Sequence, residues 1–134
     1  MKLIPFISVG EFKFNTNIEN YTSIYKFAYS PCDDITGWDK YKSNEFMFEI
    51  YTLDSLIVSI ACRKQCIYKR KNLIEMLIND FISTYKINPD KIEKMFIGNE
   101  KKAQKIYEFD SLGLQIWVRD TKIVTIFCSP KIIE

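Results

Sequence analysis

Two stretches of nine residues are nearly the same, and their repetition constrains the fold of this chain more than any other feature. DSLIVSIAC covers residues 54–62, and DTKIVTIFC covers residues 120–128, 66 positions further along. Asp, Ile, Val, Ile and Cys recur in register, and apolar residues alternate as in a strand with one buried face. A match this short can arise by chance, so its weight depends on the neighbouring sequence.

A second strand precedes each nonapeptide. FMFEIYT covers residues 46–52 and LGLQIWV covers residues 112–118, with apolar residues at the same alternate places. Each strand then meets Asp-Ser or Asp-Thr, which favour a tight turn. Each copy therefore predicts a β-hairpin.

A helix pattern lies upstream of each hairpin. IENYTSIYK covers residues 18–26 and INDFISTYK covers residues 78–86. Ile18, Tyr21 and Tyr25 are spaced as one face of a helix, and the second segment has the same stripe. The chain thus resembles a tandem duplication of a helix and a hairpin, and the alternative is convergence of ordinary amphipathic patterns.

The expected fold class is α+β. We predict a single domain over residues 1–134, with one repeat over about 12–62 and a second over about 72–128. The tandem helix–β-hairpin repeats would form an antiparallel sheet, with both helices packed on one face in a two-layer sandwich. The side chains expected in the shared core are Ile18, Tyr21, Val58, Ile60, Ile78, Phe81, Val124 and Ile126.

Charge and composition exclude several functions. Basic residues number 19 and acidic residues 17, a balance that argues against a dedicated nucleic-acid binder. The chain has no histidine, which excludes Ser-His-Asp and Cys-His catalysis. We therefore expect a protein that is not an enzyme and needs no cofactor. No apolar run reaches the length of a membrane span and the start lacks a cleavage site, so we expect the cytoplasm.

The cysteines are expected to be structural. Cys62 and Cys66 have C-x3-C spacing, while Cys32 and Cys128 are distant in the sequence. A zinc site needs four ligands arriving together. Cys62 and Cys128 lie in line with apolar strand positions, which favours packing as small hydrophobes over a metal site. In the cytoplasm all four should be reduced thiols.

An acidic segment with aromatic residues is the candidate contact site. SPCDDITGWDKYKSNEF covers residues 30–46, and Pro31 and Gly37 punctuate it, so it should be a loop. A tryptophan there is either a plug over the core or an anchor for a partner. A second contact is expected around residues 93–100. The candidate partner-binding residues are Asp33, Asp34, Trp38, Asp39, Tyr41 and Glu45.

The densest basic run is RKQCIYKRK, residues 63–71. Tyr68 among five positive charges would suit single-stranded nucleic acid. The run is not repeated in the second copy, so a solvated connection is the favoured interpretation. If the acidic segment is not the interface, this run is the next candidate.

Three segments carry a resemblance to a known class. PFISVGEFKFNTNIENY (5–21), NLIEMLINDFISTYK (72–86) and YEFDSLGLQIWVRDTKIVTIFCS (107–129) resemble small bacterial immunity proteins of contact-dependent growth inhibition and other polymorphic toxin systems. The resemblance covers most of the chain. It implies a cytoplasmic protein without catalytic activity that binds one cognate toxin C-terminal domain, such as a nuclease, and blocks its active or substrate-binding surface. It implies no direct contact with nucleic acid or membrane.

The plan of the chain also resembles, in architecture only, the secreted β-lactamase inhibitor proteins. The alternative function is a small-molecule or peptide-binding sensor domain that uses the face of the sheet. A pocket lined by Tyr and Trp with buried charges would favour the sensor, and an exposed acidic and aromatic patch would favour the inhibitor.

Overall fold

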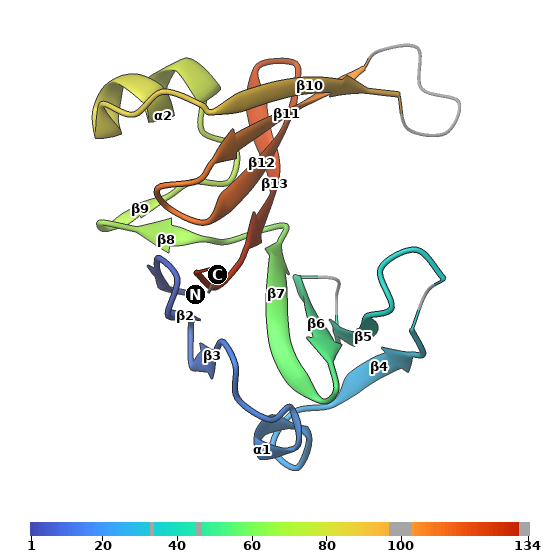
Figure 1. Ribbon diagram of the computed structural model, residues 1–134. Helices are drawn as coiled ribbons and strands as arrows, with labels where there is room; N and C mark the ends of the chain where they lie inside the picture. The colour runs from blue at the N-terminus through green and yellow to red at the C-terminus, as the bar shows by residue number, and fades with distance from the viewer. Residues whose placement is uncertain (33, 45–46, 97–102, 132–134) are drawn as a thin grey trace.

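The computed structural model describes residues 1–32, 34–44, 47–96 and 103–131 (Figure 1). Strands account for 50% of these described residues and helices for 11%, so this part of the chain is mostly β. The elements in chain order are β1 (Leu3–Ile4), β2 (Ser8–Val9), β3 (Phe12–Lys13), α1 (Glu19–Thr22), β4 (Phe27–Ser30), β5 (Asp39–Ser43), β6 (Phe48–Leu53), β7 (Leu56–Cys62), β8 (Ile67–Tyr68), β9 (Lys71–Asn72), α2 (Ile78–Tyr85), β10 (Lys91–Met95), β11 (Gln104–Phe109), β12 (Leu114–Arg119) and β13 (Lys122–Cys128).

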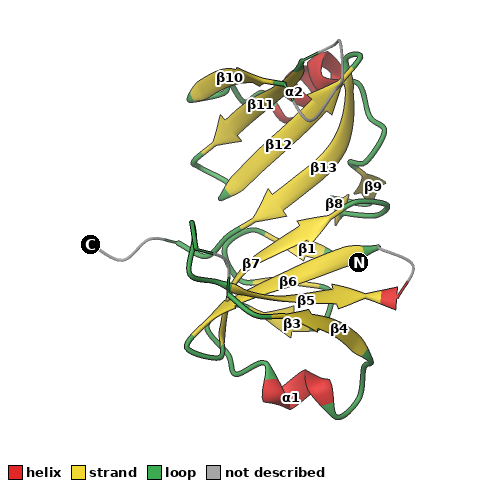
Figure 2. Cartoon of the chain, turned by 90° about the vertical axis from the view of Figure 1, so that its right-hand side faces the viewer, coloured by secondary structure: helices red, strands yellow, loops and turns green. Residues whose placement is uncertain are grey.

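One large antiparallel sheet organises the molecule. Its strand order is β10-β11-β12-β13-β7-β6-β5-β4, and Figure 2 shows the strands in this sequence. The sheet consists of two four-stranded meanders, β4–β7 and β10–β13, which we call the first and second half-sheets. They join where β7 pairs with β13, through three residue pairs centred on Ala61 and Phe127.

The half-sheets share their internal geometry. The β6–β7 turn at Asp54 and Ser55 has positive φ at both residues, and so does the β12–β13 turn at Asp120 and Thr121. Residue Asn17 before α1 bridges to β7, and the residue before α2 bridges to β13 at the matching place. The join between β7 and β13 pairs equivalent residues around its centre, so the two halves are related by an approximate two-fold axis.

The predicted α+β sandwich is wrong. Helix α1 has only four residues and α2 has eight, and Figure 1 shows them at opposite ends of the molecule instead of together over the sheet. Ile18 and Tyr21 lie on the single turn of α1, and Tyr25 follows it in the turn that leads to β4. The core face is covered by the short strands β1–β3 and β8–β9 as well as by the helices.

A β-bulge in each half-sheet sets which side chains enter the core. The pairing of β6 with β7 shifts after Tyr51, so Val58 has no partner residue on β6. The pairing of β12 with β13 shifts in the same way and leaves Val124 without a partner on β12. A bulge adds one residue and so displaces the alternation. As a result Ile57 and Ile123 are fully buried, while the predicted burial of Val58 and Val124 is wrong because they are half-buried.

The rest of the predicted core is mostly confirmed. Tyr21 is half-buried, with its ring against Phe12 at 4.9 Å. The predicted core residues that are buried are Ile18, Ile60, Ile78, Phe81 and Ile126.

No helix in the described part of the chain is long and apolar enough to cross a membrane.

Candidate functional site

The face of the large sheet opposite the core, the outer face, carries a line of four aromatic side chains that we call the aromatic row. The ring centroid of Trp38 lies 6.1 Å from that of Tyr51, Tyr51 lies 6.1 Å from Phe127, and Phe127 lies 5.9 Å from Trp117. All four side chains are half-buried. The row begins just before β5 and continues over β6, β13 and β12, so it crosses the junction of the half-sheets.

Strand alternation places these rings on the outer face. Ile50 on β6 and Ile126 on β13 are fully buried in the core. Their neighbours Tyr51 and Phe127 must therefore point the other way. Sequence reasoning singled out Trp38 but missed the other three rings, and the available signal was the large aromatic residues at outward positions of alternating strands.

A shielded ion pair lies beside the aromatic row. The side chain of Glu49 is only 6% exposed, and its Oε1 lies 2.8 Å from Nε of Arg63. The Tyr51 hydroxyl donates a hydrogen bond to Oε2 at 2.8 Å. A further Arg63 nitrogen, Nη1, donates to Oγ1 of Thr125 at 3.2 Å. This network ties β6 to the end of β7 and to β13, across the junction.

The network perturbs two titrating groups. Burial by itself would raise the pKa of Glu49, but the hydrogen bonds from Tyr51 and Arg63 and the Arg63 charge outweigh it and lower that pKa. Burial, followed by the hydrogen bond to Glu49, raises the pKa of Tyr51 well above its usual value. At neutral pH the carboxylate is therefore charged, and the phenol keeps its proton.

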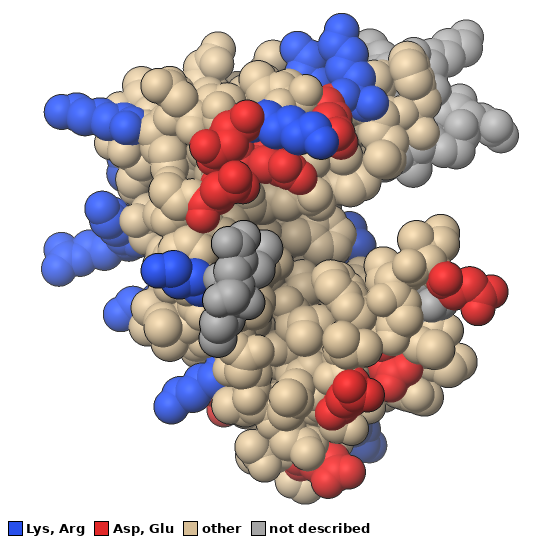
Figure 3. Space-filling view, viewed as in Figure 1, with Lys and Arg blue, Asp and Glu red and all other residues tan. Residues whose placement is uncertain are grey.

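A hollow of about 500 Å³ opens on the outer face at the second half-sheet. Its lining includes Trp117 and Phe127 of the aromatic row together with Arg63, Gln104 and Arg119. Figure 3 shows the molecule hollowed between the two half-sheets, on the right of the view. Guanidinium groups bind carboxylates and phosphates through paired hydrogen bonds, so this hollow suits an anionic group.

The structure separates the residues predicted to form one contact site. Trp38 is on the outer face, whereas Tyr41 packs with Phe27 and Tyr29 on the opposite side of the sheet. Asp39 begins strand β5 opposite the buried Thr52, so residues 39–43 are a strand and the predicted continuous loop is wrong there.

Of the four acidic members of that set, the structure describes two, Asp34 and Asp39. Asp34 is exposed in the loop before Trp38. Asp33 and Glu45 lie outside the described residues. Of the second predicted contact, residues 93–95 belong to the exposed edge strand β10, and residues 97–100 lie outside the described residues.

The basic run is a small hairpin. Strands β8 and β9 pair within it, and Lys69 and Arg70 form its turn with positive φ at both residues. Only its first member, Arg63, reaches the ion pair on the outer face, while Cys66 in its middle is fully buried.

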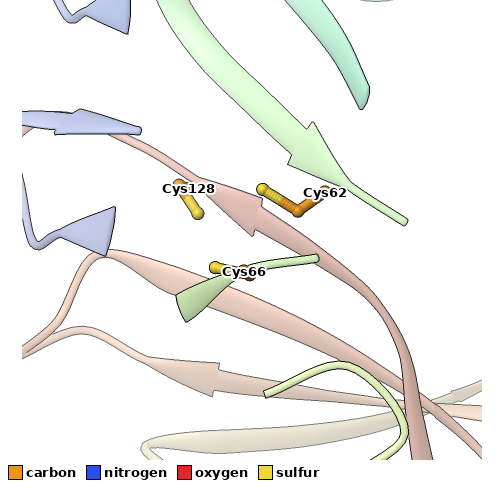
Figure 4. A group of neighbouring side chains, drawn as sticks. All are labelled: Cys62, Cys66 and Cys128. Atoms are coloured by element: carbon orange, nitrogen blue, oxygen red, sulfur yellow. The ribbon is translucent and has the colours of Figure 1, made fainter. Parts of the chain in front are cut away.

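Three cysteines from distant parts of the chain meet in the core. The Sγ atoms of Cys62, Cys66 and Cys128 all lie within 4.8 Å of one another, and all three residues are buried (Figure 4). Cys62 and Cys128 end the paired strands β7 and β13. The side-chain oxygen of Asn72 accepts a hydrogen bond from the backbone N–H of Cys66 at 2.9 Å, which holds the third cysteine in place. Sequence spacing treated Cys128 as distant and so missed this cluster.

The three thiols of the cluster differ in pKa. Hydrogen bonds from Cys128 and Cys62 lower the pKa of Cys66 to about 4. Hydrogen bonds with Cys62 and Cys66, together with burial, raise the pKa of Cys128. The pKa of Cys62 is also raised, because its bond with Cys128, which acts to lower it, is outweighed by its bond with Cys66 and by burial. These mutual hydrogen bonds make Cys66 the most acidic of the three thiols.

Comparisons with protein-family models, with curated proteins and with solved structures found no significant match to this chain. The class of protein is thus described by its structure alone: a β-rich chain with one large antiparallel sheet and an outer face that carries aromatic and arginine side chains.

Proposed function

We propose that the protein is a non-enzymatic immunity protein that neutralises a cognate toxin domain by binding it on the outer face of the sheet. The aromatic row is the observation that carries this proposal. Rows of Trp, Tyr and Phe with an adjacent Arg are typical of the residues that dominate protein–protein binding energy. The bound chain would block the toxin's active or substrate-binding surface.

The support beneath the aromatic row favours a preformed interface. Three of its four rings stand on strands at the centre of the large sheet. Beside them Arg63, held by Glu49 in the first half-sheet, donates a hydrogen bond to Thr125 in the second. Side chains fixed in this way lose little conformational entropy on binding. Rigid strands thus suit an inhibitor whose target does not vary.

The hollow is the natural place for polar contacts with the toxin. Arg63 and Arg119 line it, and the charge of Arg63 is balanced by Glu49. We infer that the toxin places groups that accept hydrogen bonds against these guanidinium groups, and that Trp38 anchors the opposite end of the interface. We further propose that the complex forms in the cytoplasm and involves no direct contact with nucleic acid or membrane.

The test is a calorimetric titration with the toxin C-terminal domain encoded beside the gene of this protein. Trp38→Ala and Phe127→Ala should each weaken binding by about 30-fold, the effect of a hot spot of about 2 kcal/mol. Tyr29→Ala is the matched control, because Tyr29 is an exposed aromatic residue on edge strand β4, away from the row. Unchanged affinity of both row variants, with unchanged stability, would place the interface elsewhere.

The hollow supports one alternative, a sensor of small molecules or peptides. Its volume of about 500 Å³ is within the range of ligand sites. An anionic ligand seated between Arg63 and Arg119 would lie against the Trp117 ring and quench its fluorescence. Saturable quenching by a small carboxylate or phosphate compound, without binding of the toxin domain, would favour this alternative over the immunity protein.

A further inference from the structure

The cysteine cluster lies away from the outer face and has no part in the proposed function. Its three sulfur atoms belong to three separate segments, yet Figure 4 shows them converging on one point. We propose that Cys62, Cys66 and Cys128 bind a single monovalent copper ion in three-coordinate geometry. The proposal replaces the expectation of metal-free cysteines, which rested on their apolar strand positions and on the absence of histidine.

The separations of the sulfur atoms match a common ligand. Metal–thiolate bonds of about 2.3 Å place three sulfurs around one ion at mutual distances of about 4 Å. In the structure all three Sγ atoms lie within 4.8 Å of one another. Side-chain movements of less than about 1 Å would therefore complete the coordination.

The number and type of ligands favour Cu⁺ over Zn²⁺. The described residues place three potential ligands in this group, all of them thiols, and the chain has no histidine. Structural zinc takes four ligands in a tetrahedron. The three cysteines are 0%, 0% and 1% exposed, which leaves no access for a water molecule as a fourth ligand. Soft thiolates without harder ligands select Cu⁺.

Binding requires no change of oxidation state. Each ligating thiol gives up its proton to the solvent as its sulfur–copper bond forms, and copper remains Cu⁺ throughout. The ion would connect the ends of β7 and β13 with the segment before β8. Because those strands join the two half-sheets, the ion would stabilise the folded chain against unfolding.

The experiment is an anaerobic titration of the fully reduced protein with the Cu⁺ complex of bicinchoninate. The expected result is transfer of one equivalent of Cu⁺ per chain, with loss of the visible absorbance of the chelate, a new ultraviolet thiolate-to-copper band and a rise in Tm. Cys128→Ser and Cys128→Ala should abolish the transfer. Cys32→Ser is the matched control and should bind as the wild type does, because Cys32 is exposed and outside the cluster.

Two outcomes would overturn the proposal. One is a wild-type protein that leaves the copper on the chelator, a result that does not depend on whether any variant folds. The other is stoichiometric uptake of Zn²⁺ with no uptake of Cu⁺, which would require a fourth ligand. Circular dichroism of each variant establishes that a loss of binding comes from the missing sulfur and not from unfolding.

Discussion

Glu49 illustrates how a single charged residue is kept on a sheet face. Its carboxylate is shielded from solvent but accepts hydrogen bonds from Arg63 and Tyr51. Burial of an unpaired charge is costly, whereas a paired and hydrogen-bonded charge is tolerated. The pair also joins β6 to the end of β7, so the residue contributes to stability and to the shape of the outer face.

We expect Glu49→Gln to destabilise the protein by about 1–3 kcal/mol at neutral pH, because it removes charge-assisted hydrogen bonds. The folded-state pKa of Glu49 is lowered, so its contribution is present above the unfolded value near 4.5 and disappears as the pH falls through the folded pKa. Urea unfolding at several pH values measures the difference from wild type, which should vanish in acid. Glu93→Gln, at an exposed ion pair with Lys91, should change stability little at any pH.

The bulge residues give a second prediction at this scale. Ile57→Ala should cost about 2–5 kcal/mol, because it opens a cavity in the core. Val58→Ala should cost clearly less, since Val58 is the half-buried bulge residue. Chemical denaturation of both variants decides the matter, with Ile123 and Val124 as an independent pair. Equal losses within a pair would mean that the bulge does not set the core register.

Among the elements, the two hairpin turns stand out because both central residues have positive φ. Ser55 has φ 67° and Thr121 has φ 68°. Turns of this kind match the twist of hairpin strands but favour Asn and Gly. A β-branched residue such as threonine is strained in this conformation. The second hairpin therefore keeps a local cost that glycine would remove.

We expect Thr121→Gly to stabilise the protein by about 0.5–1 kcal/mol, after the greater flexibility of glycine in the unfolded chain is subtracted. Ser55→Gly should give a smaller gain, because serine is not β-branched. Thermal unfolding of both variants, followed by circular dichroism, tests the order. A loss of stability in Thr121→Gly would show that the threonine side chain contributes more than its backbone strain costs.

The central hairpins could be predicted from the sequence because their alternation is regular. Strand β5 could not, since it reads DKYKS and is charged at three of its five positions. Such a pattern resembles a polar loop until its pairing with β6 is known. The length of the first helix was overestimated because its apolar stripe looked regular. Ile18 and Tyr21 belong to one helical turn, and Tyr21 and the following Tyr25 pack their rings against Phe12.

The candidate site was predictable only in part. Trp38 was identified from its polar surroundings, and the structure places it, half-buried, on the outer face. Its neighbours Tyr51 and Phe127 come from other strands, and sequence patterns do not say which strands of the two hairpins are adjacent. The same limit applies to Cys128, which approaches Cys62 only because β7 pairs with β13.

At the scale of the molecule, the two half-sheets depend on a shared core more than on the sheet itself. The ladder between β7 and β13 has only three residue pairs, centred on Ala61 and Phe127. By contrast, one continuous cluster of buried side chains runs from Leu3 to Cys128 and includes residues of both halves. Continuity of the core, and not of hydrogen bonds, should therefore determine how cooperatively the chain unfolds.

The two tryptophans allow this to be tested, because Trp38 precedes β5 and Trp117 lies in β12, one in each half of the chain. Trp117→Phe leaves a fluorescent probe of the first half, and Trp38→Phe leaves a probe of the second. If the common core makes the chain a single folding unit, each variant should show a fluorescence midpoint in urea that coincides with its own midpoint by circular dichroism. Fluorescence midpoints that depart from circular dichroism in opposite directions in the two variants would mean that each half-sheet carries its own stability. The small join between β7 and β13 would then act as a hinge, and the aromatic row that crosses it would no longer be a preformed surface.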